Sequence, residues 1–272
     1  MEINDSFRFW ITGGRLSQVC EFYDLIRPQA STGLRKVRVG NVSGDGGYIM
    51  ADDFDDIRVA LSLGIADEIS WDEEMTRRGV DVFQFDHTVD PPAQVETNPR
   101  LHFYKCGVAG KTDLQKNLKN IENILMDEIG DQSGDLILKM DIEGSEWESL
   151  LTISDETLKR FRQICIEIHN PLARPAQRVL RNRNLNVLRK LHRNFAPIHF
   201  HANNEGMDRN LFGIVVPRAI EVTYIRRDGQ VFFSSDEVFP GKLDVPNSPD
   251  RSDVMLTEIL RAVDFIKAKR TA

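Results

Sequence analysis

Carboxylates gather directly after one short apolar segment of this 272-residue chain. The segment Leu-Ile-Leu-Lys-Met at 136–140 is followed by Asp141, Glu143 and Glu146. Ionised carboxylates at the end of a buried strand are costly unless a cation, a histidine or a ligand compensates them. If the strand continues, Asp141 and Glu143 point to the same side, and Gly144 lets the chain turn. An acidic helix N-terminus, favoured by the helix dipole, is the alternative interpretation.

Another acid and several histidines follow other apolar segments. Glu167 and His169 lie at the end of the segment 164–168, and His199 and His201 are spaced to share one face of a strand. Imidazole can act as a general base, and carboxylates can orient it or bind a hard cation such as Mg²⁺. The cysteines show no zinc-binding spacing. The candidate metal ligands are Asp141, Glu167 and His169, and the candidate catalytic residues are His169, His201 and Glu143.

A glycine and an acid suggest a nucleotide site. Gly64 follows the apolar segment 59–63, and Asp86 follows the segment 80–85. A glycine turn with an acid about 20 residues later is typical of nucleotide-binding sheets, where the carboxylate accepts the ribose hydroxyls. The chain has one glycine here rather than a full G-x-G-x-x-G set. A tight turn with a capping Asp therefore remains an alternative.

Apolar segments alternate with helical patterns along the middle of the chain. The segments 59–63, 80–85, 101–104, 136–140 and 164–168 are mostly apolar, as is typical of buried parallel strands. Helices are expected over 112–130, 175–194 and 252–269 from their caps and apolar stripes. The segments 198–201, 211–216 and 221–225 fit antiparallel strands at one edge. The pattern predicts an α/β fold with a mostly parallel, doubly wound sheet, whose ligands bind at the carboxyl ends of the strands.

The composition narrows the class of protein. We expect a single domain over 1–272, with a helical N-terminal extension over 1–35 and a C-terminal loop and helix over 228–272. The net charge of −7 argues against a nucleic-acid-binding protein. No apolar run approaches the ~20 residues that span a bilayer, and no signal peptide is recognised. We expect a soluble, cytoplasmic protein without membrane insertion, and the sequence does not indicate its oligomeric state.

Six segments in order resemble the FkbM-type methyltransferases, in particular the branch that carries a D-G-G-Y segment before the sheet. They are G-D-G-G-Y (44–48), S-L-G-I (62–65), K-M-D-I-E-G-S-E (139–146), I-E-I-H (166–169), H-A-N-N (201–204) and E-V-T-Y-I-R (221–226). The resemblance runs from about residue 38 to 227. It implies a class I methyltransferase fold with a Rossmann-like sheet, S-adenosylmethionine as the methyl donor, and a hydroxyl acceptor, often on a sugar or a natural product.

The resemblance also implies where the donor binds. Many relatives have a glycine-rich D-x-G-x-N-x-G loop where this chain has Gly64 alone, so the D-G-G-Y segment is expected to help hold the amino-acid end of the donor. The expected donor-binding residues are Asp45, Gly46, Gly47, Tyr48, Gly64, Asp86, Gly107 and Asp141.

We therefore expect an O-methyltransferase that acts on a small-molecule or glycan acceptor. A hydroxyl is a weak acid, so it needs either a histidine base or a divalent cation, Mg²⁺ or another, and the sequence leaves both open. Two other classes of function also remain open. One is a nicotinamide-dependent reductase, although the G-x-G-x-x-G set and a Tyr-x-x-x-Lys pair are missing. The other is a non-catalytic binding module that keeps the fold.

Overall fold

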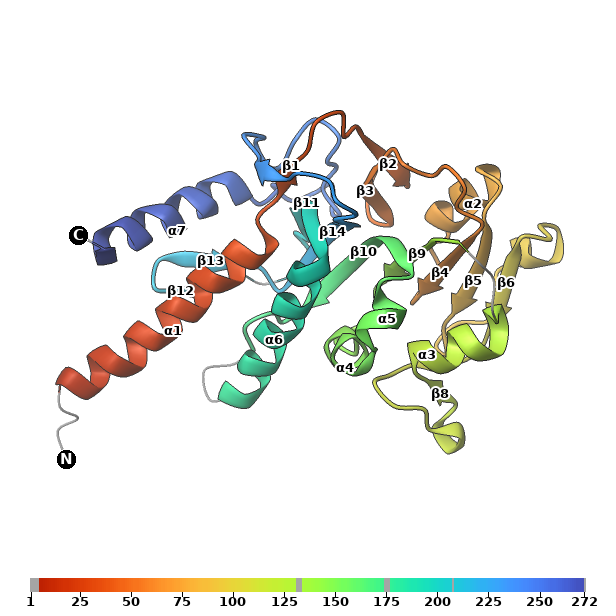
Figure 1. The fold of residues 1–272 in the computed structure, drawn as a ribbon, viewed down its shortest axis with the longest axis horizontal. Helices are drawn as coiled ribbons and strands as arrows, with labels where there is room; N and C mark the ends of the chain where they lie inside the picture. Colours follow the sequence, from red (N-terminus) through yellow and green to blue (C-terminus); the bar gives the residue numbers. More distant parts are fainter. Residues whose placement is uncertain (1–4, 131–133, 174–176, 207, 272) are drawn as a thin grey trace.

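A seven-stranded sheet runs through the centre of the molecule (Figure 1). The computed structural model describes residues 5–130, 134–173, 177–206 and 208–271. The order of the strands is β11-β14-β10-β9-β4-β5-β6. Their bounds are β4 Val59–Leu63, β5 Asp81–Phe85, β6 Leu101–Tyr104, β9 Leu136–Met140, β10 Phe161–His169, β11 Phe195–Ala202 and β14 Ala219–Arg226.

The chain changes direction across the sheet between β4 and β9. From β4 it builds outward through β5 to β6, and it then returns to place β9 on the other side of β4, followed by β10. Such a switch point opens a crevice at the carboxyl ends of the two strands, where ligands bind in open α/β sheets. The predicted α/β fold with a mostly parallel, Rossmann-like sheet is confirmed.

The prediction of antiparallel strands at one edge of the sheet is confirmed in part. Strand β14 is antiparallel to both of its neighbours, β10 and β11, and among the described strands of this sheet it alone runs opposite to the rest. Helix α6 (Arg178–Asn194) crosses over between β10 and β11, so β11 runs parallel to the core strands. The segment 211–216 belongs to a separate hairpin of β12 (Arg209–Leu211) and β13 (Ile214–Val216).

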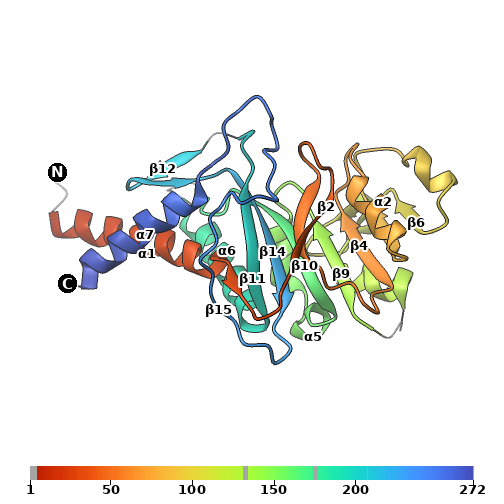
Figure 2. The same ribbon diagram turned by 90° about the horizontal axis from the view of Figure 1, so that it is seen from above.

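Different elements cover the two faces of the sheet (Figures 1 and 2). Helices α1 (Asp5–Ile26), α4 (Glu146–Thr152) and α6 pack on one face. Helix α2 (Ser70–Arg77) and the hairpin of β2 (Lys36–Gly40) and β3 (Gly47–Ala51) cover the other. The tip of this hairpin carries the D-G-G-Y segment to the carboxyl ends of the strands. The remaining short elements are β1 Gln29–Ala30, η1 Ala93–Glu96, β7 Gly107–Val108, α5 Asp155–Leu158 and β15 Phe233–Ser234.

The predicted helix over 112–130 is wrong in its first half. Asp113 accepts hydrogen bonds from the backbone N–H groups of Gln115 and Lys116 and so caps only a short 3₁₀ turn, which Asn117 ends at φ +54°. The helix proper begins after Asn120, whose side chain caps it. The observed elements are η2 Leu114–Lys116, β8 Leu118–Lys119, α3 Ile121–Ile124 and the π-helical η3 Leu125–Ile129.

The terminal helices lie side by side at one end of the molecule (Figure 1). The expected N-terminal extension contains α1, with residues 1–4 outside the described part. Helix α7 (Leu256–Thr271) begins later than predicted, because the side chain of Asp253 pairs with His201 as well as accepting a hydrogen bond from the N–H of Val254. Within the described ranges, we find no helix with the length and apolar character needed to cross a membrane.

Gly64 lets β4 and β9 approach each other at the switch point. Its φ is +76°, and a Cβ atom at this position would lie 1.7 Å from the backbone oxygen of Asp141. Only glycine avoids both the backbone strain and the collision. The single glycine of this loop is therefore required by packing between the two strand ends.

We predict that Gly64→Ala destabilises the fold more than Gly79→Ala. Gly79 has a similar φ of +86° but open space around its missing Cβ, so it isolates the backbone strain. The collision with Asp141 should lower the free energy of unfolding of Gly64→Ala by about 1–3 kcal/mol more, measured by urea denaturation. Equal losses in the two variants would show that the close approach is not a constraint.

Candidate active site

A cavity of about 320 Å³ opens at the switch point, a volume within the usual range for small-molecule sites. It lies at the carboxyl ends of β4, β5 and β9, under the tip of the β2–β3 hairpin. Of the eight expected donor-binding residues, all but Gly47 line it: Asp45, Gly46, Tyr48, Gly64, Asp86, Gly107 and Asp141. Gly47 instead packs within the hairpin, where a Cβ would lie 2.1 Å from the backbone oxygen of Asn41.

Part of the cavity lining is apolar. Ile65, Phe85 and Val108 belong to it, together with Gly107. A Cβ on Gly107 would lie 2.6 Å from the ring of His87, so glycine keeps the wall thin. This part of the cavity suits a flat apolar group such as a nucleobase.

Asp86 ties the loop after β4 to the end of β5. One carboxylate oxygen accepts hydrogen bonds from the backbone N–H groups of Ile65 and Ala66, at 3.0 and 3.1 Å, and the other from the N–H and hydroxyl of Thr88, at 2.7 and 2.6 Å. Burial alone would raise the pKa of Asp86, but these hydrogen bonds outweigh it and hold the pKa below its usual value. All four acceptor positions are in use, so a ribose bound here would share them with Thr88.

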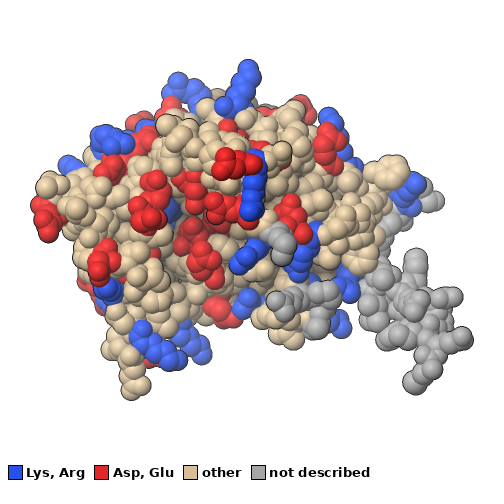
Figure 3. Space-filling model, turned by 180° about the vertical axis from the view of Figure 1, so that it is seen from behind, with Lys and Arg blue, Asp and Glu red and all other residues tan. Residues whose placement is uncertain are grey.

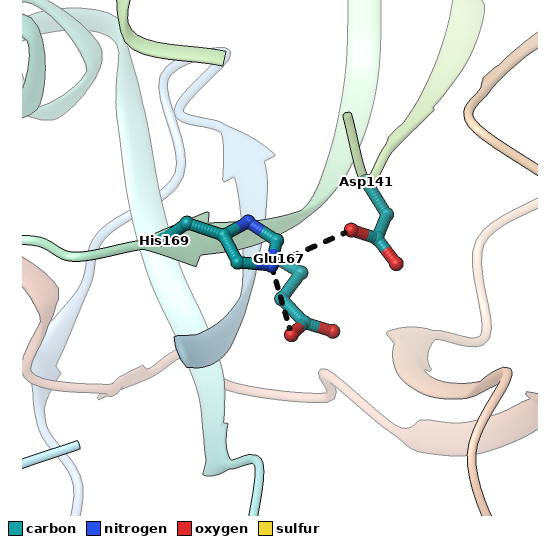
Figure 4. A group of neighbouring side chains, drawn as sticks. All are labelled: Asp141, Glu167 and His169. Carbon is teal, nitrogen blue, oxygen red and sulfur yellow. Dashed lines mark ion pairs between the residues drawn. The ribbon is translucent and has the colours of Figure 1, made fainter. Parts of the chain in front are cut away.

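Asp141, Glu167 and His169 converge beside the cavity (Figure 4). Their potential ligand atoms all lie within 4.8 Å of one another. The Nε2 atom of His169 lies 3.9 Å from Asp141 Oδ1 and 3.5 Å from Glu167 Oε1. Two oxygens and one nitrogen at this spacing form a donor set that divalent cations accept. The structure therefore brings together the three residues expected to bind a metal.

Glu146 orients His169 and is a site residue that the sequence reasoning did not assign. It is fully buried and lies 3.0 Å from His169 Nδ1, and it accepts hydrogen bonds from the backbone N–H groups of His169 and Gly144, both at 2.7 Å. A proton on Nδ1 shared with this carboxylate leaves the lone pair on Nε2 facing Asp141 and Glu167. The sequence signal was the third acid of the run after β9.

Burial and mutual repulsion shift the pKa values of the residues in this group. Desolvation raises the pKa of Asp141 to about 6. Desolvation raises the pKa of Glu167 well above its usual value, and the neighbouring Asp141 and Glu221 carboxylates add to the rise. Burial would lower the pKa of His169, but Glu146 and Asp141 outweigh it and raise the pKa. Within the described part of the chain, Asp141 Oδ1 is buried without a hydrogen-bond partner. The group is thus poised to bind a proton or a cation.

Glu143 lies close to His169, but it follows the end of the strand and is not part of it as expected. Strand β9 ends at Met140, and Glu143 lies in the following turn at φ +55°. Its side chain is 84% exposed, with Oε2 3.6 Å from His169 Nε2. A non-glycine residue in this region of backbone space is strained and is often found at functional sites. Glu143 therefore faces His169 from the solvent side.

His201 lies in a neighbouring ion-pair network, which Glu221 links to Glu167. Its Nε2 lies 3.0 Å from Asp253 Oδ2 and its Nδ1 lies 3.6 Å from Glu221 Oε2. Burial alone would lower the pKa of His201, but Asp253 and Glu221 outweigh it and raise the pKa to about 10. Protonated imidazole has no lone pair for an acceptor proton. The geometry favours His169 over His201 as the histidine base.

The segment 241–255, which we call the C-terminal strap, is tied to the ends of β11 and β14. His199 Nε2 lies 2.8 Å from Asp244 Oδ1, and Asp253 pairs with His201. The side chain of Asn247 donates hydrogen bonds to Asp45 and Glu221, both at 2.8 Å. The strap therefore borders the acidic group. Figure 3 shows Asp and Glu side chains gathered across the middle of one face of the molecule.

Comparisons with known proteins add little. No protein-family model and no curated protein sequence matches this chain. A solved structure that it resembles is the Burkholderia thailandensis 1,6-didemethyltoxoflavin-N1-methyltransferase with bound 1,6-didemethyltoxoflavin and S-adenosylhomocysteine. The identity is 11%, the coverage is 82% of each chain and the TM-score is 0.30. A similarity of this size carries no conclusion about the activity of this chain.

We predict that the His201 network makes stability depend on pH. The folded-state pKa of about 10 lies above the unfolded value of about 6.5, so the stabilisation is complete below about pH 6.5 and is lost as the pH rises towards 10. In His201→Gln, the deficit in unfolding free energy should be largest near pH 6.5 and shrink by up to about 1.4 kcal/mol per pH unit above it. Asp253→Asn should behave alike in urea denaturation. A deficit that is constant between pH 6.5 and 10 would contradict the assignment.

Proposed function

We propose that this chain is an S-adenosylmethionine-dependent O-methyltransferase that acts on a small-molecule or glycan hydroxyl. One observation carries the proposal: Asp141 lines the cavity at the switch point and also belongs to the group with Glu167 and His169. A donor in the cavity would therefore lie next to groups that can receive the proton of an acceptor. The resemblance of six ordered segments to FkbM-type methyltransferases supports the same chemistry.

The residues present suit the needs of methyl transfer. The methyl group passes in line from the sulfonium to the acceptor oxygen, and the O–H proton must leave to a base. Glu146 holds Nδ1 of His169, so that Nε2 faces Asp141 and Glu167 beside the cavity. The carboxylate of Asp141, with its pKa of about 6, is tuned close to neutral pH. Either His169 Nε2 or the carboxylate of Asp141 can accept the proton of the acceptor hydroxyl.

The same three residues fit a divalent cation. Asp141, Glu167 and His169 supply two carboxylates and one imidazole, and Asp141 Oδ1 has no hydrogen-bond partner among the described residues. A cation held there would lower the pKa of an acceptor hydroxyl. The density of acids exceeds what a histidine base needs, which favours this form of the proposal.

We predict that S-adenosylhomocysteine binds and that NADH and NADPH do not. A reductase would need phosphate contacts from a glycine-rich loop, whereas Gly64 is the one glycine of the loop after β4. Isothermal titration calorimetry with the three ligands checks this prediction. Binding of a nicotinamide cofactor in place of S-adenosylhomocysteine would contradict the proposal and indicate a reductase. Binding of S-adenosylhomocysteine without turnover on any hydroxyl acceptor would favour the binding module.

We predict that Asp141→Asn abolishes the response to divalent cations. Mg²⁺ or Mn²⁺ should raise the Tm of the wild-type protein by binding the folded state, and the variant should lose this shift while it still binds S-adenosylhomocysteine. Its methyl transfer should fall by at least about 10²-fold. Asp90→Asn, which changes an exposed acid paired with Lys105, is the matched control.

The cation and base forms of the proposal give different results. If a cation is used, chelation with EDTA should reproduce the loss in Asp141→Asn. If His169 alone is the base, chelation should change nothing and His169→Ala should cost about 10²–10⁴ in rate. Full activity of Asp141→Asn without metal would contradict both.

A further inference from the structure

The cavity contains one side-chain ammonium group among many carboxylates. Its described lining includes six acids and, from the lysines and arginines, only Lys139. The acids are Asp45, Asp67, Glu68, Asp86, Asp141 and Glu143. Such a lining attracts cations and repels anions, except around Lys139.

Lys139 is buried beside the loop after β4. It lies on β9 and is 4% exposed, and its Nζ donates a hydrogen bond to the backbone oxygen of Gly64 at 2.8 Å. On another side, the ring centroid of Tyr48 lies 5.9 Å from Nζ. An ammonium group has three N–H donors, and the contact with Gly64 uses one of them.

Two carboxylates interact with Lys139 through space without touching it. They are the buried Asp72 and Asp141, and burial raises the pKa of both in spite of the lysine charge. Among the described residues, however, no carboxylate forms an ion pair or a hydrogen bond with Lys139 Nζ. A buried lysine is most stable with a carboxylate in direct contact. Because Lys139 also lines the cavity, a ligand anion can supply the direct contact that Asp72 and Asp141 do not make.

We infer that Lys139 binds the α-carboxylate of the methionine portion of the donor, an inference that rests on the proposed function. S-adenosylmethionine carries two cationic groups, the sulfonium and the α-ammonium, and one anionic group, the carboxylate. The acids of the cavity suit the two cations. The carboxylate would be repelled anywhere in this lining except at Lys139.

The single glycine of the loop points the same way. A loop with several glycines would offer backbone N–H groups to an anion, but here Gly64 packs against Asp141, and the N–H groups of Ile65 and Ala66 are taken by Asp86. Lys139 supplies a donor at the same place. The amino-acid end of the donor then lies at Gly64 and Tyr48, and the adenine in the apolar part by Phe85 and Val108.

Calorimetry with two ligands tests this assignment. S-adenosylhomocysteine contains the amino-acid portion, whereas 5′-methylthioadenosine keeps the adenosine and the thioether but lacks it. Lys139→Met should weaken binding of S-adenosylhomocysteine by about 10- to 100-fold, the scale of a charged hydrogen bond. It should leave the affinity for 5′-methylthioadenosine within about twofold. Lys105→Met, at an exposed lysine, is the control and should change neither.

The other outcomes separate the possibilities. Equal weakening of both ligands would show that Lys139 only supports the Gly64 loop, and unchanged affinity for S-adenosylhomocysteine would also overturn the assignment. If the wild-type protein binds neither ligand, the proposed function itself fails.

If Lys139→Met does not fold, a comparison of two ligands on the wild-type protein still tests the assignment. Decarboxylated S-adenosylhomocysteine lacks only the carboxylate and should bind the wild-type protein at least about 10-fold more weakly than S-adenosylhomocysteine. Equal affinity of the two compounds would overturn the assignment without any substitution.

Discussion

Glu167 is 3% exposed, and its carboxylate shares its surroundings with the carboxylates of Asp45, Asp141 and Glu221. Like charges this close cannot all remain ionised without compensation. The compensation comes from separate parts of the chain. Glu146 on α4 holds His169 against the group, Asn203 donates a hydrogen bond to Glu167, and Asn247 of the C-terminal strap donates hydrogen bonds to Asp45 and Glu221. The elements around the strand ends are thus tied together by one electrostatic requirement.

The central sheet could be predicted because strands that are buried on both faces appear in the sequence as short, mostly apolar segments. The segments at 59–63, 101–104 and 136–140 coincide with β4, β6 and β9. The predicted helix over 112–130 failed in its first half, because hydrogen bonds to the Asp113 side chain and the left-handed backbone of Asn117 override a helical apolar stripe. At the edge, β14 is antiparallel as predicted. The direction of β11 could not be predicted, because it depends on the crossover helix α6 and not on the composition of the strand.

The candidate site could be predicted where it follows strand ends. Asp141, Glu167 and His169 come together because the carboxyl ends of β9 and β10 are adjacent in a parallel sheet. Asp253 and Asn247 could not be assigned, since they reach the site from a strap far along the chain with no motif. His201 was a reasonable candidate for the base because it is a histidine near a strand end. Its carboxylate partners, which favour the protonated ring, are distant in sequence and so could not be predicted.

The central claim is that the donor lies in the switch-point cavity next to Asp141, Glu167 and His169. The most direct measurement is a crystal structure of the protein with S-adenosylhomocysteine and Mn²⁺, with anomalous scattering to locate both sulfur and manganese. The account predicts the ligand between Gly64 and Asp86, its sulfur facing Asp141, and manganese on the three predicted ligands. Ligand density elsewhere on the molecule, with these strand ends holding neither ligand nor metal, would contradict it.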